Sequence, residues 1–111
     1  MTVTVKVLIP AKTAENSQTT QYTATGVTTL IDKFTATNYS ASLATISVNL
    51  VTLADTAGNA NLIVKDKPLQ AGQTYIFPEL VGQALASGGF ISTIVSASSS
   101  INIRANGREI T

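Results

Sequence analysis

The sequence predicts an all-β protein, an antiparallel β-sandwich that is jelly-roll-like, with about eight or nine short strands and one short helical turn. About a third of the 111 residues are β-branched (17 Thr, 10 Ile and 9 Val), and such side chains favour strands. Apolar and polar residues alternate in several short segments, which Gly-, Asn- and Ser-rich clusters separate at the intervals typical of sandwiches. Residues 1–111 are expected to form a single domain with one core.

Four strands are predicted in the first half of the chain. The first is Thr2–Ile9, whose one face carries Val3, Val5, Val7 and Ile9 and is expected to be half-buried. Pro10 either ends this strand or marks a sheet edge. After a polar loop at Ala11–Gln18, the next strands are expected at Thr19–Thr25, Leu30–Thr37 and Ala44–Leu53. Within the third strand, the predicted inward residues are Leu30, Phe34 and Ala36.

Shorter elements follow in the second half. A loop at Asp55–Asn61 leads to a strand that starts at Leu62–Val64, and a turn at Gln70–Gln73 leads to a strand at Thr74–Phe77. The spacing of apolar residues then changes. Pro78–Leu85 carries Pro and Glu at its start and apolar residues at helical spacing, so one to two helical turns are expected there.

The last elements show two different strand signals. Phe90–Ser96 is apolar on both faces, as in a central strand covered on both sides. After a connection at Ala97–Ser100, Asn106-Gly107 stands between Ile101–Ala105 and Arg108–Thr111. An Asn-Gly pair flanked in this way predicts a two-residue type I′ hairpin.

Composition excludes several kinds of chemistry. Histidine and cysteine are absent, which removes the commonest general base, the thiolate nucleophile, disulfides and all Cys/His metal sites. Only 12% of residues are charged and the net charge is +1, with Lys and Arg dispersed, which argues against nucleic acid as a partner. No apolar run is long enough to span a membrane, and no signal peptide is recognisable.

No residue is singled out as catalytic or cofactor-binding. The carboxylates are separated along the chain, and the serines lack a Gly-x-Ser-x-Gly or Ser-x-x-Lys context. Asp55, Asn59 and Asn61 surround Gly58 but lack the order of a calcium loop, so a hairpin loop is the preferred interpretation and no metal site is predicted. The candidate protein-interface residues are Val3, Val5, Val7, Tyr39 and Phe77, because exposed edge strands and aromatic side chains serve as interface anchors.

Several sequence segments, distributed over nearly the whole chain, also resemble those of a known protein family. They are Leu30–Asn38, Ala44–Leu50, Asn61–Lys65 leading to Ala71–Tyr75, Pro78–Val81, and Ile101–Gly107. Together they resemble the capsid decoration, or staple, proteins of short-tailed double-stranded-DNA bacteriophages. The resemblance implies a virion structural protein that binds the outer surface of the icosahedral capsid as a homodimer and bridges neighbouring major capsid protein subunits. It implies neither a cofactor nor a small-molecule substrate.

Two other function classes stay open at this stage. A glycan-binding sandwich for cell-surface attachment would need Tyr22, Tyr39 and Tyr75 to converge on one face, and the chain has no Trp. An enzyme would need the dispersed carboxylates to meet in a pocket, and we expect the protein not to be an enzyme.

Overall fold

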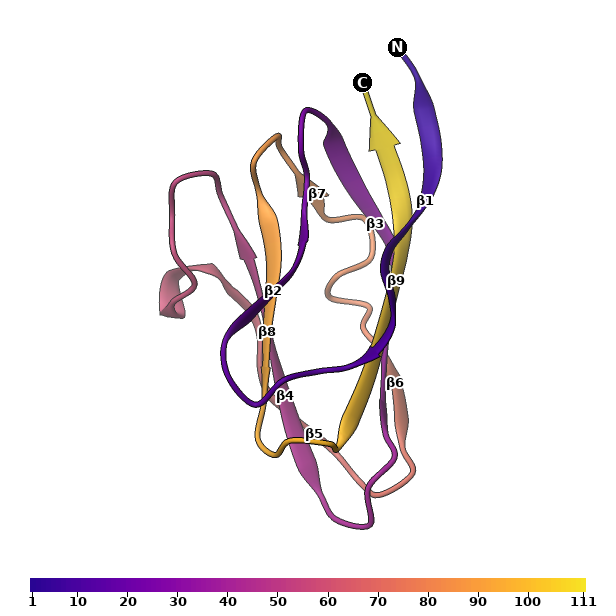
Figure 1. The fold of residues 1–111 in the computed structure, drawn as a ribbon, viewed down its shortest axis with the longest axis vertical. Helices are drawn as coiled ribbons and strands as arrows, with labels where there is room; N and C mark the ends of the chain where they lie inside the picture. The colour runs from indigo at the N-terminus through magenta and orange to yellow at the C-terminus, as the bar shows by residue number, and fades with distance from the viewer.

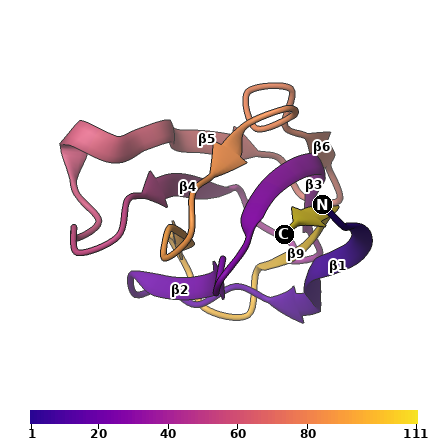
Figure 2. The same ribbon diagram turned by 90° about the horizontal axis from the view of Figure 1, so that it is seen from above.

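The computed structural model describes all residues, 1–111, and consists of two antiparallel sheets that face one another (Figures 1 and 2). The elements are β1 (Val3–Thr13), β2 (Thr19–Thr23), β3 (Thr28–Asn38), β4 (Ala44–Val51), a 3₁₀ turn η1 (Asn59–Asn61), β5 (Leu62–Leu69), β6 (Thr74–Ile76), β7 (Ala84–Leu85), β8 (Phe90–Val95) and β9 (Ile101–Ile110). The only helical element is η1, and no helix is long and apolar enough to cross a membrane.

The strand order is that of a jelly roll. One sheet has the order β1-β9-β3-β6, with β7 paired to β3, and the other has the order β2-β8-β4-β5. Leaving β7 aside, the chain folds back on itself in nested pairs: β1 with β9, β2 with β8, β3 with β6 in one sheet, and β4 with β5. This nesting divides the pairs between two sheets and gives the two Greek keys of the jelly roll. The predicted fold class is confirmed.

The core lies between the two sheets and contains 21 buried apolar residues. Its aromatic centre is Phe34 of β3 with Phe77 after β6, whose rings meet edge to face at 5.1 Å. The predicted central strand β8 is confirmed, because it lies between β2 and β4 with most of its residues buried. Phe77 is fully buried, so it is a core residue and not a surface anchor, contrary to its place among the interface candidates.

The predicted hairpin at Asn106-Gly107 is wrong, because β9 runs unbroken from Ile101 to Ile110. Gly107 is required there for close approach instead of a turn. A Cβ atom at this position would lie 2.1 Å from the backbone oxygen of Leu30 and 2.8 Å from Cδ1 of Leu8. The strands on both sides bulge at this level, with Leu8 as the extra residue of β1 and Asp32 as that of β3.

These bulges change which residues face the core. In β3 the inward residue before the bulge is Ile31 and the next is Phe34, so Leu30 is not inward as predicted. In β1 the bulge buries Leu8 and Ile9 together, while Val3, Val5 and Val7 are exposed and not half-buried. The strand also continues through Pro10 to Thr13, on the edge of its sheet, as the second interpretation of Pro10 predicted.

The helical turns expected at Pro78–Leu85 are absent. This segment makes successive turns, closed by bonds such as Leu80 N–H to Phe77 C=O at 3.2 Å. Gly82 has a positive φ of 83° and donates to Ile31 C=O at 2.7 Å, while Gln83 C=O accepts from the Ile31 N–H at 2.9 Å. The segment therefore forms short turns instead of a helix, is held to β3 by its bonds with Ile31, and continues as β7.

Two polar clusters join the two sheets, and each includes a residue of β2. In the first cluster the Tyr22 hydroxyl of β2 donates to Glu109 of β9 and also lies 2.7 Å from the Thr29 hydroxyl of β3. Burial and the neighbouring Glu109 carboxylate raise the pKa of Tyr22 to about 12. The bond from Tyr22, helped by Lys6, holds the pKa of Glu109 below its usual value of 4.5.

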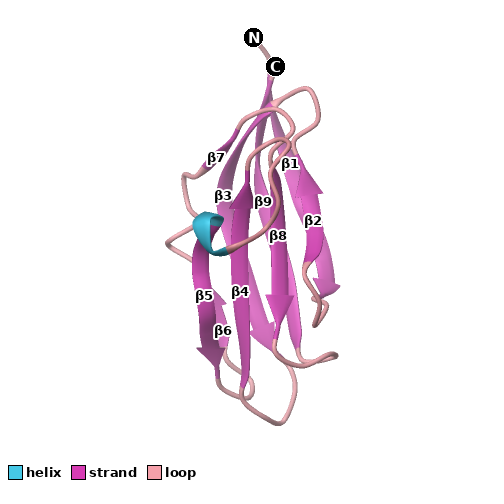
Figure 3. Ribbon diagram, turned by 90° about the vertical axis from the view of Figure 1, so that its left-hand side faces the viewer, coloured by secondary structure: helices cyan, strands magenta, loops and turns pink.

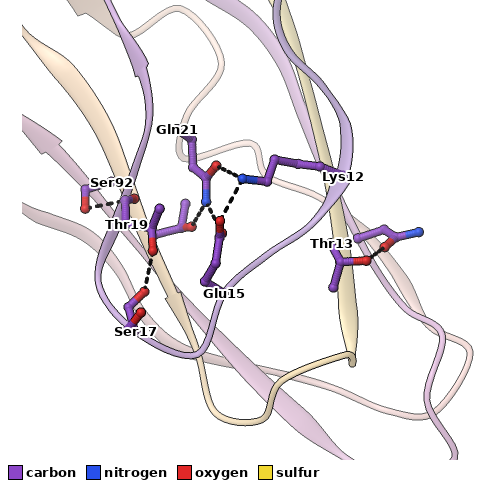
Figure 4. Close-up of polar contacts among 9 residues, drawn as sticks. Lys12, Thr13, Glu15, Ser17, Thr19, Gln21 and Ser92 are labelled. Carbon is purple, nitrogen blue, oxygen red and sulfur yellow. Dashed lines mark hydrogen bonds and ion pairs between the residues drawn. The ribbon is translucent and has the colours of Figure 1, made fainter.

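The second cluster, which includes Gln21, fixes the crossover from β1 to β2 (Figure 4). Lys12 Nζ donates to Glu15 at 2.9 Å and to Gln21 at 2.8 Å, and Gln21 Nε2 donates to Glu15 at 2.8 Å and to Thr93 of β8 at 3.1 Å. The bonds from Lys12 and Gln21 lower the pKa of Glu15. The crossover between the sheets is therefore held by charge-assisted hydrogen bonds.

We expect Gly107→Ala to destabilise the fold by at least about 3 kcal/mol, because the added methyl group meets a backbone oxygen that cannot move without breaking the sheet. The matched control is Gly58→Ala, since Gly58 has an extended φ of −167° and nothing within 4 Å of the added Cβ. Urea unfolding measures both. Equal midpoints for the two variants would contradict the close-approach role of Gly107.

We expect the free energy of unfolding to fall as the pH is lowered below about 4.5, the ordinary pKa of glutamate. Both Glu15 and Glu109 have lowered pKa values in the fold, so their contribution is complete above 4.5 and is lost as the pH falls through the folded-state values. Urea midpoints measured across this range test it. Glu15→Gln should show a shallower acid dependence than the wild type.

Candidate protein interface

The ends of β1 and β9 form one tip of the molecule, with the two chain termini side by side (Figures 1 and 3). Thr2 and Thr111 exchange both backbone hydrogen bonds, at 3.3 and 3.0 Å. From this pair the register runs without interruption to Val7 opposite Asn106, where the bulge at Leu8 begins. The segment Val3–Val7 is therefore a straight stretch of strand.

The free edge of this segment is set by the pairing with β9. In an antiparallel ladder, opposite residues alternate between pairs that exchange hydrogen bonds and pairs that do not. Because Thr2 and Thr111 exchange bonds, Thr4 and Lys6 also direct their backbone groups toward β9. The N–H and C=O groups of Val3, Val5 and Val7 consequently point away from the sheet. No other strand pairs with this side of β1.

The same three valines form an exposed apolar stripe. Val3 is 49% exposed, Val5 83% and Val7 42%. Their cross-strand neighbours on this outer face are Ile110, Arg108 and Asn106 of β9. Arg108 is engaged by Asp32 through two bonds of 3.0 and 2.8 Å, so the face beside the stripe carries a paired cation and not a free one.

The opposite face of this segment is polar. Lys6 lies 3.3 Å from Glu109, which also accepts the Tyr22 hydroxyl. The charge of Lys6 is therefore balanced within the same molecule. The segment offers a partner unpaired backbone groups and valine side chains with no net charge.

The remaining sheet edges are protected against pairing. The rest of β1 contains a second register shift, Pro10 and Lys12. β5 is interrupted by register shifts and carries Lys65, Lys67 and Pro68, while β2 has a register shift and β6 has only three residues. Bulges, charge, proline and short length are the usual means of blocking edge pairing. Val3–Val7 is the straight, apolar edge of the fold.

Tyr39, the other exposed candidate, lies at the opposite end of the sandwich, in the loop between β3 and β4. Its hydroxyl lies 3.5 Å from that of Thr13, at the far end of β1 from Val3. The loop exposes Tyr39 by 50% and Leu43 by 56%. The structure thus brings Val3, Val5 and Val7 together but separates Tyr39 from them.

The β3–β4 loop is held by the buried side chain of Asn38. Its Nδ2 donates to Ser42 C=O at 2.8 Å and to Leu69 C=O at 2.9 Å, and its Oδ1 accepts from the Ser40 N–H at 2.9 Å. The loop is therefore pre-ordered with its two apolar side chains at the surface. Sequence analysis missed Leu43, although an isolated leucine beside the polar turn Asn38–Ser42 was a usable signal.

The other sites considered in the sequence show no convergence of reactive groups. Asn61 Oδ1 accepts from Asn49 Nδ2 at 2.6 Å and from the Gly58 N–H at 3.1 Å, so the Asp55–Asn61 loop satisfies its own amides. No group of three or more His, Cys, Asp or Glu side chains could hold a metal ion. Of the three tyrosines, Tyr22 is buried between the sheets, so they do not form a common platform.

Two depressions are present on the surface. One of about 100 Å³ is mostly apolar and lies at the end of the sandwich near Leu53 and Leu85. The other, of about 160 Å³, is mostly polar and is lined by Gln18, Ser47, Asn49 and Lys65, among others. The Gln18 amide there donates to Ser92 at 2.7 Å and to Asn49 at 3.3 Å. The Gln18 and Asn49 amides therefore hydrogen-bond to each other within the fold.

Comparison with known proteins places the chain in no family. No protein-family profile matches the sequence, and no curated protein matches it. Among solved structures, the chain is similar to a chain in the structure of infectious bursal disease virus strain Gx, with a TM-score of 0.46 and 12% sequence identity. The match covers 97% of this chain and 30% of that chain, so the protein spans less than a third of the chain it resembles.

Proposed function

We propose that the protein is a non-enzymatic structural protein of a virion that binds the outer surface of an icosahedral capsid. As a homodimer, it links neighbouring major capsid protein subunits and stabilises the shell against the pressure of packaged DNA. The observation that carries this proposal is the single open strand edge, Val3–Val7, on a jelly roll whose other edges are protected. The resemblance of the sequence to phage staple proteins supplies the class of partner.

The distribution of exposed apolar residues supports a role in linking. The valine stripe lies at one end of the long axis and the Tyr39 and Leu43 loop at the other, on a molecule that measures 46 Å along that axis. We assign the valine edge to the second copy of the chain and the β3–β4 loop to the capsid. The low charge of the surface suits dense packing of copies, because neighbours with few charges repel one another little.

The capsid shell would be stabilised through thermodynamic linkage between binding and assembly. A protein that binds the assembled shell but not free subunits lowers the free energy of the assembled state alone. No reaction and no cofactor are involved. The polar clusters at Tyr22 and Lys12 keep the two sheets in a fixed relation.

Co-sedimentation with mature shells that lack decoration protein, and with unassembled coat protein, tests the proposal. We expect saturable binding to shells and much weaker binding to free subunits. Absence of binding to shells would contradict the capsid role, and equal binding to both would contradict its dependence on the lattice. A glycan array run on the same protein tests the alternative function, attachment to a cell surface.

The double variant Tyr39→Ala/Leu43→Ala should weaken shell binding about tenfold or more, since both side chains are exposed and the loop is ordered by Asn38. Its unfolding midpoint should stay near that of the wild type. The matched control is Val81→Ala, which removes an apolar side chain of similar exposure from the Pro78–Gly82 turns. Binding by the double variant at wild-type affinity would exclude the β3–β4 loop as the capsid contact.

A further inference from the structure

The open edge of β1 indicates how the two copies of the proposed homodimer contact each other. We infer that two copies pair antiparallel through Val3–Val7, with Val5 opposite Val5 of the second copy and Val3 opposite Val7. The two five-stranded sheets then join edge to edge into one continuous sheet. The inference rests on the homodimer of the proposed function, and its test needs no capsid.

The direction of the backbone groups fixes which residues pair. Only the odd-numbered residues of this segment direct their N–H and C=O groups to the open side. A register that places Val5 opposite Val5 makes all three odd residues hydrogen-bonded pairs, each exchanging two bonds. A register shifted by one residue places valines opposite residues whose backbone groups are already bonded to β9. A shift by two residues in either direction leaves only two of the three valines of each copy opposite another valine.

The bulge at Leu8 ends the pairing segment. The straight register of β1 stops after Val7, and the chain then turns its next residues toward the core. The pairing length is therefore limited to Val3–Val7, and a two-fold axis through its centre passes between the two Val5 residues. Such an axis closes the assembly at two copies, since the edge of each is then occupied.

The charges permit this self-pairing. Lys6 is the only charged residue of the segment, and in this register it lies opposite Thr4 of the second copy and not opposite another lysine. Each Lys6 also keeps its own Glu109 at 3.3 Å. Like charges directly opposite one another would oppose pairing, and none occurs here. A partner selected by charge would require an unbalanced residue on this edge, which the segment lacks.

The two-fold axis also sets the shape of the dimer. The paired segment lies at the tip of each molecule (Figure 3). Because the two segments run antiparallel, the two bodies extend in opposite directions. The two β3–β4 loops, each at the far end of its molecule from Val3, are then at the two extremities. The six paired valines remain together on one face of the joined sheet, because a two-fold axis perpendicular to a sheet preserves its faces.

Cysteine cross-linking tests the register, since the chain has no cysteine of its own. Val5→Cys should oxidise to a disulfide-linked dimer, because the Cα atoms of a hydrogen-bonded pair lie about 5.5 Å apart, within the range that a disulfide spans. Val3→Cys and Val7→Cys should each stay largely uncross-linked alone, since identical positions are about 13 Å apart. An equal mixture of these two variants should cross-link. Val81→Cys controls for random collision.

Equilibrium sedimentation of the unmodified protein provides the second measurement, with an expected mass of twice 11.5 kDa. Val5→Pro should sediment as a monomer with an unchanged far-ultraviolet spectrum, because the Val5 N–H that proline removes points to the open edge and not to β9. A monomeric wild type at the highest attainable concentration would overturn the inference. So would a dimer that cross-links equally well through Val3→Cys, Val5→Cys and Val7→Cys alone.

The two proposals fail in different ways. If the cross-linked Val5→Cys dimer forms but does not sediment with shells, the capsid role is wrong and the pairing stands. If the Val5→Pro monomer binds shells with wild-type affinity and the wild type is monomeric, the pairing is wrong and the capsid role stands.

Discussion

The arrangement of the five-stranded sheet depends on how closely β3 and Leu8 of β1 approach β9 at Gly107. A side chain at this position would collide with the Leu30 backbone oxygen on one side and with Leu8 on the other. Both neighbouring strands, β1 and β3, have their bulge residue at this level. The two strands therefore bend beside Gly107, the residue of β9 that has no side chain. The Asp32 carboxylate of the β3 bulge is fixed by two bonds from Arg108, the residue after the glycine.

The open edge is a consequence of the same contact. Because Leu8 is the extra residue, Leu8 and Ile9 are both buried, and the residues that precede them keep a straight register with β9. The bulge thus divides β1 into a half that closes the sandwich and a half that projects beyond it. Without the bulge, Ile9 would lie on the same face as the exposed valines. The edge that we propose to pair therefore arises from the packing around Gly107.

The sequence predicts strands well where the pattern repeats and poorly where a partner strand decides the outcome. Alternation located β4, and the apolar run on both faces identified β8 as a central strand. Asn106-Gly107 was misassigned because an Asn-Gly pair signals a turn locally, whereas the structure needs the missing Cβ for contacts with β1 and β3. Pro78–Leu85 has helical spacing, yet the backbone of Ile31 in β3 hydrogen-bonds to the Gly82 N–H and the Gln83 C=O.

The candidate site was predicted in part, for a related reason. Val3, Val5 and Val7 were identified by their alternation, but alternation alone predicted a half-buried strand. The bulge at Leu8 places them on the face opposite to that of Ile9. Phe77 was included because it is aromatic, and only its packing against Phe34 reveals a core residue. Burial of a single side chain depends on the strands that cover it, which no local pattern specifies.

The proposed geometry explains how a weak contact becomes selective for an assembled shell. A loop that presents two apolar side chains, Tyr39 and Leu43, is too small to bind tightly by itself. In the proposed dimer two such loops are held at fixed separation by hydrogen-bonded sheet and by the polar clusters that join the layers. Simultaneous binding then raises the overall affinity only where two coat subunits have the matching spacing, and is lost where they do not. The rigidity of the jelly roll, and not the strength of any single contact, would make such a protein specific for the lattice.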